Sequence, residues 1–234
     1  MSNANAVVPV AVKGAQLMAW FGGTFDPVHH GHLRAAEEAA LALATEVRLL
    51  PTSTPAHRPQ PQASADQRLE LLQIALAGQN RLLLDGRELR RAGPSYSVDT
   101  LIELRAEFGN GTPLALIVGA DAFAGLPDWH RWRELFGLAH LVVLNRPGAA
   151  GPEQWSSALQ HEVAARWASS ADELRLSVAG RVLAIDITPL AISATAIRAQ
   201  LAAGGSVRWL LPEAVLTRIE AQGLYAGASA GSGQ

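Results

Sequence analysis

Short runs of apolar residues alternate along the chain with longer segments in which apolar side chains recur every three or four positions. Continuous apolar runs of this kind are typical of strands that are buried on both faces of a parallel sheet. The sequence therefore predicts strands at 17–22, 46–50, 81–85, 114–118, 140–144 and 181–187, the third with an optional extension to Leu89.

Segments with helical spacing lie between these runs. The predicted helices cover about 30–45, 64–77, 97–108, 152–169, 193–202 and 212–222, with a short helix entered from the turn at 126–132. Ser64 and Ser193 are typical N-cap residues, and glycine follows the helix that ends at 108. Since strands and helices alternate, we expect an α/β fold: a Rossmann-like, doubly wound, mainly parallel sheet with helices on both faces.

Length and composition predict one folded domain. A chain of 234 residues, of which 49% are hydrophobic, can build one sizeable core. We expect the domain to span 17–225, with a helical C-terminal part at about 190–225. Residues 1–16 are small, polar and contain proline, which predicts a flexible leader, and the small polar residues 226–234 predict a disordered tail.

Charge and residue counts exclude several kinds of partner and chemistry. The formal net charge of −2 leaves no broad basic surface for nucleic acid, and no apolar run is long enough to cross a membrane. The absence of cysteine excludes disulfides, thiol catalysis and cysteine zinc sites. No convincing signal peptide is present, so we expect a cytoplasmic protein without nucleic-acid or membrane partners. A homo-oligomer is left open.

The single lysine, Lys13, lies in the predicted leader. A Walker-type phosphate loop needs Gly-Lys-Ser/Thr, and that string is absent. Lysine-based covalent chemistry is disfavoured for the same reason. Any phosphate would have to be bound by backbone N–H groups, histidine and arginine.

The most informative stretch is Gly-Gly-Thr-Phe-Asp-Pro-Val-His-His-Gly-His at 22–32. It connects the first predicted strand to the first predicted helix, where backbone N–H groups can bind a phosphate. His29 and His32 stand three apart and share a helical face. Alternatively, the histidines are surface or capping groups, or form a structural zinc site, for which Asp26 is the only nearby carboxylate.

A second candidate motif is Ile-Ser-Ala-Thr-Ala-Ile-Arg at 192–198. Ser193 is expected to cap a helix whose free N–H groups, together with hydroxyls and Arg198, would make a polyphosphate site without lysine. An ordinary capped helix with a solvated arginine is the alternative. Both motifs, the proline-rich loop 51–59, Gly-Ala-Asp at 119–121 and Arg-Pro-Gly at 146–148 follow predicted strands, so all should meet at one edge of the sheet.

These motifs resemble those of the bacterial nicotinate-nucleotide adenylyltransferases, which are nucleotidyltransferases with a His-x-Gly-His motif. The shared motifs, in order, are Gly-Gly-Thr-Phe-Asp-Pro-Val-His-x-Gly-His, Pro-x-His-Arg-Pro, Ser-Tyr-Ser-Val-Asp-Thr-Leu, Gly-Ala-Asp, Trp129, Arg-Pro-Gly, Ile-Ser-Ala-Thr-x-Ile-Arg, Leu-Leu-Pro-Glu-Ala-Val and Gly-Leu-Tyr. They span Met18 to Tyr225. The resemblance implies an enzyme of NAD biosynthesis that joins ATP and nicotinate mononucleotide to give deamido-NAD and pyrophosphate.

The resemblance also implies which residues meet ATP. His29, His32 and Arg198 are the expected catalytic residues, the histidines on the ATP phosphates and Arg198 on the β- and γ-phosphates. Further ATP-binding residues are expected at Gly22, Gly23, Thr24, Phe25, Ser193 and Thr195. Mg²⁺ is the expected cofactor, held by phosphate oxygens with few or no protein ligands. Because the attacking 5′-phosphate is already anionic, catalysis would rest on positioning and electrostatic stabilisation.

For the mononucleotide phosphate, the expected partners are His57 and Arg58, on a loop that three prolines stiffen. Both could instead be solvated. By the resemblance, Trp129 stacks on the pyridine ring, although an isolated tryptophan is more often part of the core and Trp132 competes for the role. Asp26 is expected to lie on the mononucleotide side as well.

The remaining expected residues surround the pyridine ring and the ribose. By the resemblance, backbone N–H groups near Ser97 and His130 bind the nicotinate carboxylate, with Tyr96 lining the site. Asp121 is expected to accept a hydrogen bond from a ribose hydroxyl, with a helix-capping role as the alternative. Arg146 is expected on the same rim.

The chain departs from the family pattern at two positions: His130 stands where tyrosine is expected, and Ala56 where proline is expected. The first departure weakens the prediction that acid is preferred over amide. Nicotinamide-mononucleotide and phosphopantetheine adenylyltransferases therefore stay as alternatives, although the latter are shorter and lack the Ser-Tyr-Ser segment. Class I aminoacyl-tRNA synthetases need lysines that this chain lacks. A nucleotide-sensing module without turnover is the non-enzymatic alternative.

Overall fold

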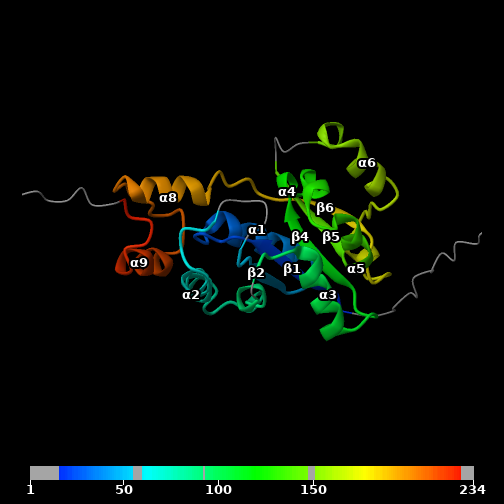
Figure 1. The fold of residues 1–234 in the computed structure, drawn as a ribbon, viewed down its shortest axis with the longest axis horizontal. Coiled ribbons are helices and arrows are strands. Elements are labelled where there is room, and N and C mark those ends of the chain that lie inside the picture. The colour runs from blue at the N-terminus through cyan, green and yellow to red at the C-terminus, as the bar shows by residue number, and fades with distance from the viewer. Residues whose placement is uncertain (1–15, 55–59, 92, 147–150, 228–234) are drawn as a thin grey trace, which may run out of the picture.

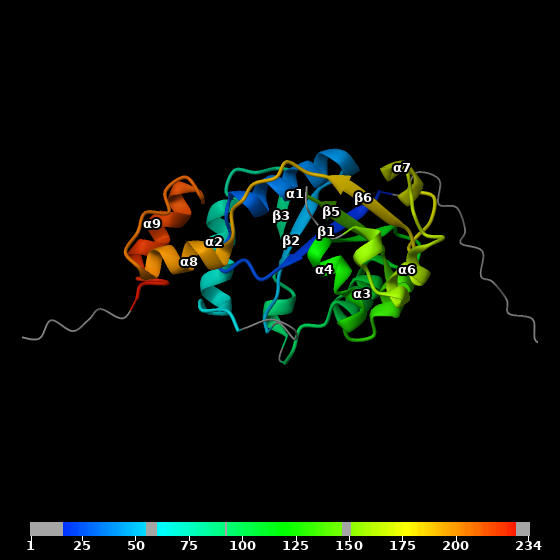
Figure 2. The same ribbon diagram turned by 90° about the horizontal axis from the view of Figure 1, so that it is seen from above.

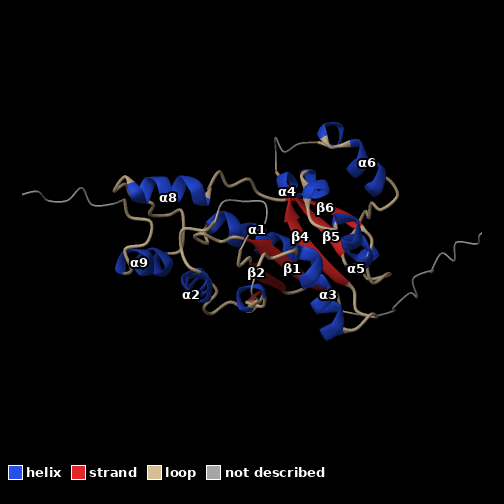
Figure 3. Cartoon of the chain, viewed as in Figure 1, coloured by secondary structure: helices blue, strands red, loops and turns tan. Residues whose placement is uncertain are grey.

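The computed structural model describes residues 16–54, 60–91, 93–146 and 151–227. Six parallel strands form one sheet in the order β3-β2-β1-β4-β5-β6 (Figures 1 and 3). Their bounds are β1 Met18–Gly23, β2 Val47–Pro51, β3 Leu82–Leu84, β4 Leu114–Gly119, β5 His140–Asn145 and β6 Val182–Asp186. The chain moves outward from β1 in both directions, so the topological switch point lies between β1 and β4.

Helices cover both faces of the sheet, as predicted. Their bounds are α1 His30–Leu43, α2 Ala65–Ala75, α3 Ser97–Phe108, α4 Ala120–Ala124, α5 Leu135–Leu138, α6 Ser157–Val163, α7 Ala171–Leu174, α8 Ala194–Ala202 and α9 Glu213–Ala221. In Figure 2, α1 lies above the strands, and α3, α4 and α6 lie below them.

Alternating side chains of β1 enter two separate cores because successive residues of a strand point to opposite faces. Ala19 and Phe21 join the core under α1, whereas Trp20 joins the core under α3. All three are buried. The continuous apolar run at 17–22 is thus explained by a central strand covered on both faces.

The last two helices lie at one end of the sheet, beside α2 (Figure 1). Val215 and Ile219 of α9 are buried in the same core as Leu72 of α2. At the surface, Arg218 forms an ion pair with Glu70 at 3.2 Å. The C-terminal part thereby brings α8 to the edge of the sheet where β1 ends.

Two predicted elements differ from the structure, and two short helices were not predicted. The third strand stops at Leu84, because the Asp85 carboxylate accepts a hydrogen bond from the Arg87 backbone N–H and turns the chain into a 3₁₀ helix at Glu88–Arg90. The helix predicted at 152–169 is only α6 and a preceding 3₁₀ turn, since Trp167 pairs with Val182 of β6 as an isolated bridge. The short helices α4 and α7 were not predicted, because neither is long enough to show a helical period.

No helix in the described part of the chain is long and apolar enough to cross a membrane.

His140, the first residue of β5, is fully buried. One imidazole nitrogen accepts from the Arg181 backbone N–H at 3.1 Å, and the other contacts the Ser177 carbonyl oxygen at 2.9 Å. Such a ring is neutral, with a proton only on the nitrogen that faces the carbonyl. Burial lowers the pKa of His140 from 6.5 to about 4.

This imidazole is expected to make stability depend on pH. Between pH 6.5 and about 4, His140 binds a proton in the unfolded chain but stays neutral in the folded chain. The free energy of unfolding therefore falls as the pH falls through this range. From about pH 7.5 to about pH 5, His140 alone should cost about 2 kcal/mol of unfolding free energy. Urea unfolding at both values measures the loss. In His140→Gln, the difference in unfolding free energy between the two pH values should be smaller by that amount. In His161→Gln, at an exposed position of α6, this difference should be the same as in the wild type. An equal difference in all three proteins would refute the assignment.

Candidate active site

A cavity of about 780 Å³ opens at the carboxyl ends of the strands, over the switch point. It brings together most of the residues predicted from the sequence. Those that line it are Gly22, Gly23, Thr24, Phe25, Asp26, His29, His32, Tyr96, Ser97, Asp121, Trp129, His130, Arg146, Ser193, Thr195 and Arg198. His57 and Arg58 lie outside the described residues.

The turn from β1 to α1 is held in shape by a buried arginine. Arg68 of α2 donates from Nη1 to the carbonyl oxygens of Thr24, at 2.8 Å, and Thr52, at 2.7 Å, and from Nη2 to that of Ser53 at 3.1 Å. Phe25 in this turn has a φ of 49°, a rare conformation for a bulky residue. The arginine thus ties the turn after β1 to the turn after β2.

His29 and His32 form a stacked pair at the start of α1. Their ring centroids lie 3.7 Å apart with an interplanar angle of 21°, and Phe25 packs edge-on against His32 at 5.0 Å. The His29 ring also caps the helix, since its Nδ1 accepts from the His32 backbone N–H at 3.4 Å. A Cβ at Gly31 would come within 3.0 Å of this ring, so the glycine between the histidines makes room for the pair.

The environment of His29 keeps its imidazole neutral. Burial lowers its pKa from 6.5 to about 4, and the charge of neighbouring His30 acts in the same direction. Because Nδ1 accepts a hydrogen bond, the single ring proton sits on Nε2. The site therefore offers a neutral N–H donor that an anionic ligand would favour.

Asp26 is buried and engaged by protein groups. Its carboxylate accepts from the backbone N–H groups of Gln62 and Ala63, at 2.8 and 3.1 Å, and from the Tyr225 hydroxyl at 2.7 Å. Burial, followed by the contact with Asp26, raises the pKa of the Tyr225 phenol. Asp26 lines the cavity. Its hydrogen bonds connect the turn after β1 to the segment before α2 and to the segment after α9. The assignment of Asp26 to the mononucleotide stays a prediction.

Arg198 faces the same turn from α8. Its Nη1 donates to the Asp26 carbonyl oxygen at 2.6 Å and lies 3.8 Å from the Asp26 carboxylate, and its Nη2 contacts Thr195 Oγ1 at 3.3 Å. Its buried Nε has no hydrogen-bond partner among the described residues. Ser193 caps α8 through the Ala196 N–H at 3.1 Å, as predicted. The guanidinium and a helix N-terminus, which favours anions, thus border one side of the cavity.

The opposite side of the cavity is aromatic. The rings of Tyr96 and His130 lie 4.4 Å apart, at the N-terminus of α3, which begins at Ser97. Trp129 is half-buried and lines the cavity, whereas Trp132 is buried in the core, where it packs edge-on against Phe136 at 6.2 Å. The structure therefore leaves Trp129 as the member of this pair that a planar ligand can reach.

The rim between β4 and β5 carries an ion pair. Arg146 Nη2 donates to Asp121 Oδ2 at 3.1 Å, and both side chains are largely exposed. Asp121 is in the first turn of α4, whose N-cap is Gly119. Helix capping by the Asp121 side chain, the alternative considered above, is not what the structure has.

No group of three or more histidine, cysteine, aspartate or glutamate side chains within the described ranges is arranged to hold a metal ion. The zinc alternative thus lacks a ligand set there.

Several residues that build the cavity were not predicted from the sequence. Arg68 holds together two turns that border the cavity, and Trp20, Glu88 and Thr100 line it. Trp20 and Arg68 lie within predicted elements, where the sequence indicates only core or solvated positions. The signal that could have found Glu88 and Thr100 is their closeness to the Ser-Tyr-Ser segment, at 95–97.

A family model and several similar proteins of known sequence point to the same family. A family model described as "Cytidylyltransferase-like" matches residues 20–200. The chain is 53% identical over 207 residues to a Halorhodospira halophila protein named "Probable nicotinate-nucleotide adenylyltransferase", covering 87% of this chain and 93% of that protein. Proteins of the same name from Stenotrophomonas maltophilia and Pseudomonas aeruginosa are 49% and 50% identical, covering 89% and 88% of this chain and 96% and 95% of theirs.

Solved structures share the fold. The nicotinic acid mononucleotide adenylyltransferase of Plasmodium falciparum, complexed with NaAD, superposes with a TM-score of 0.68 at 13% identity, covering 90% of this chain and 97% of that one. The same enzyme complexed with APC gives a TM-score of 0.66 with the same coverage. At such low identity, the likeness concerns the fold.

Proposed function

The chain belongs to the nicotinate-nucleotide adenylyltransferases of the cytidylyltransferase-like family, and from this membership we propose that it joins ATP and nicotinate mononucleotide to give deamido-NAD and pyrophosphate. It is a nucleotidyltransferase of NAD biosynthesis. A cytoplasmic location is part of the proposal, and the absence of cysteine from the chain agrees with it. One observation carries the proposal: the stacked histidines, Arg198 and the N-terminus of α8 meet around one cavity.

The ATP phosphates would lie between α1 and α8. The 5′-phosphate oxygen of the mononucleotide attacks the α-phosphorus, the bond from the α-phosphorus to the bridging oxygen breaks, and pyrophosphate leaves with the electron pair. His29 and His32 would donate to phosphate oxygens near the reacting centre. Arg198 and the N–H groups at Ser193 to Thr195 would hold the leaving pyrophosphate. Each donor would act by stabilising charge that grows in the transition state.

Mg²⁺ is part of this proposal. Its ligands would come mainly from phosphate oxygens, with few or none from protein side chains. When bound, Mg²⁺ would neutralise phosphate charge. Removal of divalent cation by a chelator should therefore stop turnover without changing the melting temperature of the ligand-free protein.

The mononucleotide would lie on the aromatic side. Trp129 would stack on the pyridine ring, and the N–H groups at the start of α3 and near His130 would bind its carboxylate. Tyr96 would line this pocket beside His130. Asp121 and Arg146 would meet the ribose and the rim, and His57 and Arg58 remain our proposal for the phosphate.

Pyrophosphate release tests the proposed function. The purified protein is assayed with ATP and Mg²⁺ on nicotinate mononucleotide, nicotinamide mononucleotide and phosphopantetheine in parallel. Strong release with nicotinate mononucleotide alone supports the proposal. Equal release with both mononucleotides would overturn the acid preference, and no release with any of them would favour a nucleotide-sensing module.

Trp129→Ala is expected to raise the KM for nicotinate mononucleotide about tenfold, because stacking on one aromatic face is lost. The KM for ATP should stay within about twofold of the wild-type value. Trp129→Phe should recover part of the loss. Trp209→Ala removes a tryptophan that is 80% exposed and outside the cavity, and serves as the control. An unchanged mononucleotide KM in Trp129→Ala would refute the stacking role.

A further inference from the structure

The cavity wall contains a buried carboxyl that the roles assigned above leave unused. Glu88 lies on the 3₁₀ turn after β3, is 4% exposed and lines the cavity. A carboxyl is almost never this buried unless polar partners hold it. Its partners therefore indicate what it does.

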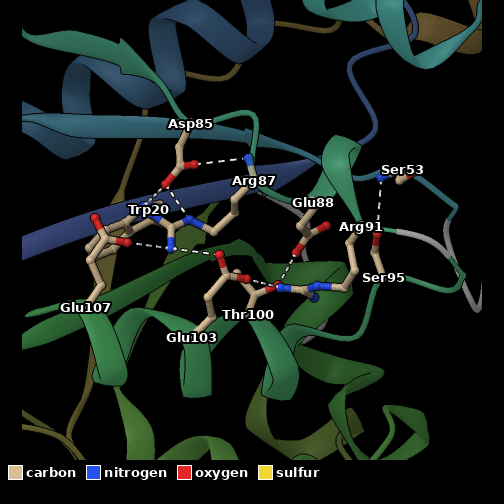
Figure 4. A network of polar contacts seen from close by, with 10 residues as sticks. All are labelled: Trp20, Ser53, Asp85, Arg87, Glu88, Arg91, Ser95, Thr100, Glu103 and Glu107. Atoms are coloured by element: carbon tan, nitrogen blue, oxygen red, sulfur yellow. Dashed lines mark hydrogen bonds and ion pairs between the residues drawn. The ribbon is translucent and has the colours of Figure 1, made fainter.

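Three hydroxyl groups surround Glu88, and they come from three different segments. Thr100 Oγ1 of α3 donates to Glu88 Oε1 at 2.7 Å. The side chains of Ser95, just before α3, and Thr52, just after β2, also act to lower the pKa of this carboxyl, as the Thr100 hydroxyl does. Figure 4 shows Glu88 between Thr100 and the loop that carries Ser95. The carboxyl thus bonds to the first turn of α3 and lies beside the turn after β2 and the Ser-Tyr-Ser segment.

A second layer of contacts fixes these hydroxyls. The Ser53 N–H donates to Ser95 Oγ at 3.1 Å, and the Ser95 N–H donates to the Thr54 carbonyl oxygen at 3.0 Å. Arg91 Nη1 donates to Thr100 Oγ1 at 3.2 Å and pairs with Glu103 (Figure 4). The hydroxyl of Thr100 is therefore held in one orientation, with its proton toward Glu88.

The groups around Glu88 shift its pKa in opposite directions, which agrees with a role in positioning the segments that it contacts. Burial raises the pKa of Glu88, while the hydrogen bond from Thr100 and the positive charge of Arg91 oppose that rise. Without the carboxyl, the buried Thr100 hydroxyl would lose its acceptor, and an unsatisfied group of this kind loosens the segment that carries it. Ser95 is next to Tyr96, the N-cap of α3, so loosening would act on the helix N-terminus directly.

We propose that Glu88 is a positioning residue that holds residues 95–97 and the N-terminus of α3 in the geometry that binds the mononucleotide. It acts through Ser95 and Thr100 and does not touch ATP. The kinetic part of this proposal rests on the proposed function. Replacement of Glu88 should therefore change the KM for the mononucleotide but not the KM for ATP.

The kinetic test compares Glu88→Ala with the wild type. Glu88→Ala should raise the KM for nicotinate mononucleotide at least about tenfold, with the KM for ATP within about twofold. Glu88→Gln, which keeps the shape and can still bond to hydroxyls, should recover most of the affinity. Thr100→Val should act in the same direction as Glu88→Ala, and the double variant should be no worse than Glu88→Ala alone, because both act through one contact.

Glu107→Ala is the matched control. Glu107 belongs to the same network through Arg87 but lies at its exposed end and does not line the cavity. Its substrate KM values should be unchanged. A rise of both KM values in Glu88→Ala, or a lower melting temperature with both KM values unchanged, would overturn the proposal. If Glu88→Ala does not fold, Thr100→Val decides by the same KM criterion.

Amide hydrogen exchange separates this proposal from the proposed function. In the ligand-free protein, amides of 95–100 should exchange faster in Glu88→Ala than in the wild type or Glu107→Ala. Unchanged exchange there would refute the positioning role whatever the reaction is. Conversely, a wild-type protein that releases no pyrophosphate would refute the proposed function, and hydrogen exchange alone would then decide whether Glu88 holds the segment.

Discussion

Replacement of His32 by alanine is expected to lower kcat at least about 10³-fold, which in a standard assay abolishes turnover. The side chain has two roles at the site. We propose that it donates to a phosphate oxygen in the transition state, and its ring stacks on His29 at 3.7 Å, which keeps the second donor in place. Loss of one preorganised donor costs about 3–4 kcal/mol, and displacement of His29 adds to this.

The folded protein should tolerate this change. The His32 ring lines the cavity rather than filling a core, so the melting temperature of His32→Ala should stay close to the wild-type value. His30→Ala is the matched control, because its side chain does not line the cavity and the hydrogen bond from its backbone N–H to the Leu210 carbonyl oxygen is kept. The replacement removes the charge that helps to lower the pKa of His29, but burial, the larger cause, still lowers that pKa. Single-turnover pyrophosphate release measures the chemical step. Wild-type turnover in His32→Ala would refute the assignment.

Replacement of Arg198 by alanine is expected to lower kcat/KM for ATP by about 10²–10³-fold. The guanidinium already lies against the turn after β1, with Nη1 2.6 Å from the Asp26 carbonyl oxygen, so it is oriented before the substrate binds. Its loss would remove both a charge for the leaving pyrophosphate and a tie between α8 and that turn. Arg198→Lys should recover little, since an ammonium cannot replace the two-pronged contact.

Arg208→Ala provides the comparison for Arg198. It removes a guanidinium close in sequence, but one that is 59% exposed and does not line the cavity. Steady-state kinetics with varied ATP distinguish the two variants. If Arg198→Ala and Arg208→Ala lost activity to the same small extent, a general electrostatic effect would explain both, and the specific role of Arg198 would be wrong.

The regular elements could be predicted because their signals are local. The helix predicted at about 97–108 is confirmed as α3, Ser97–Phe108, since its apolar spacing is long enough and glycine follows it. The strand at 81–85 was predicted too long, and the apolar Leu89 suggested a further extension. The strand ends at Leu84 because the Asp85 carboxylate accepts a hydrogen bond from the Arg87 N–H, and the chain turns there. The apolar pattern does not indicate this bond. The helix at 152–169 failed for a similar reason, since pairing of Trp167 with β6 replaced helical bonding.

The site was predictable where its residues belong to motifs at strand ends. His29, His32, Ser193 and Arg198 could be expected together because parallel strands deliver their following turns to one edge. Trp129 and Trp132 could not be separated by spacing, because either can pack in a core; only the structure buries Trp132 and leaves Trp129 in the cavity wall. For Asp26, the sequence could not show the Tyr225 hydroxyl, which lies 199 residues away.

The α/β fold class, the order of the elements and the two phosphate-type motifs could be predicted from the sequence alone, because apolar periodicity and turn residues act over a few neighbouring positions. Only the folded structure shows which polar side chains hold the site together: Arg68 across two turns, Asp26 with Tyr225, and Glu88 with Thr100. Such contacts join segments that are distant in the chain, and burial without water makes their partners obligatory. Nothing local in the sequence distinguishes these residues from others of the same type on the surface.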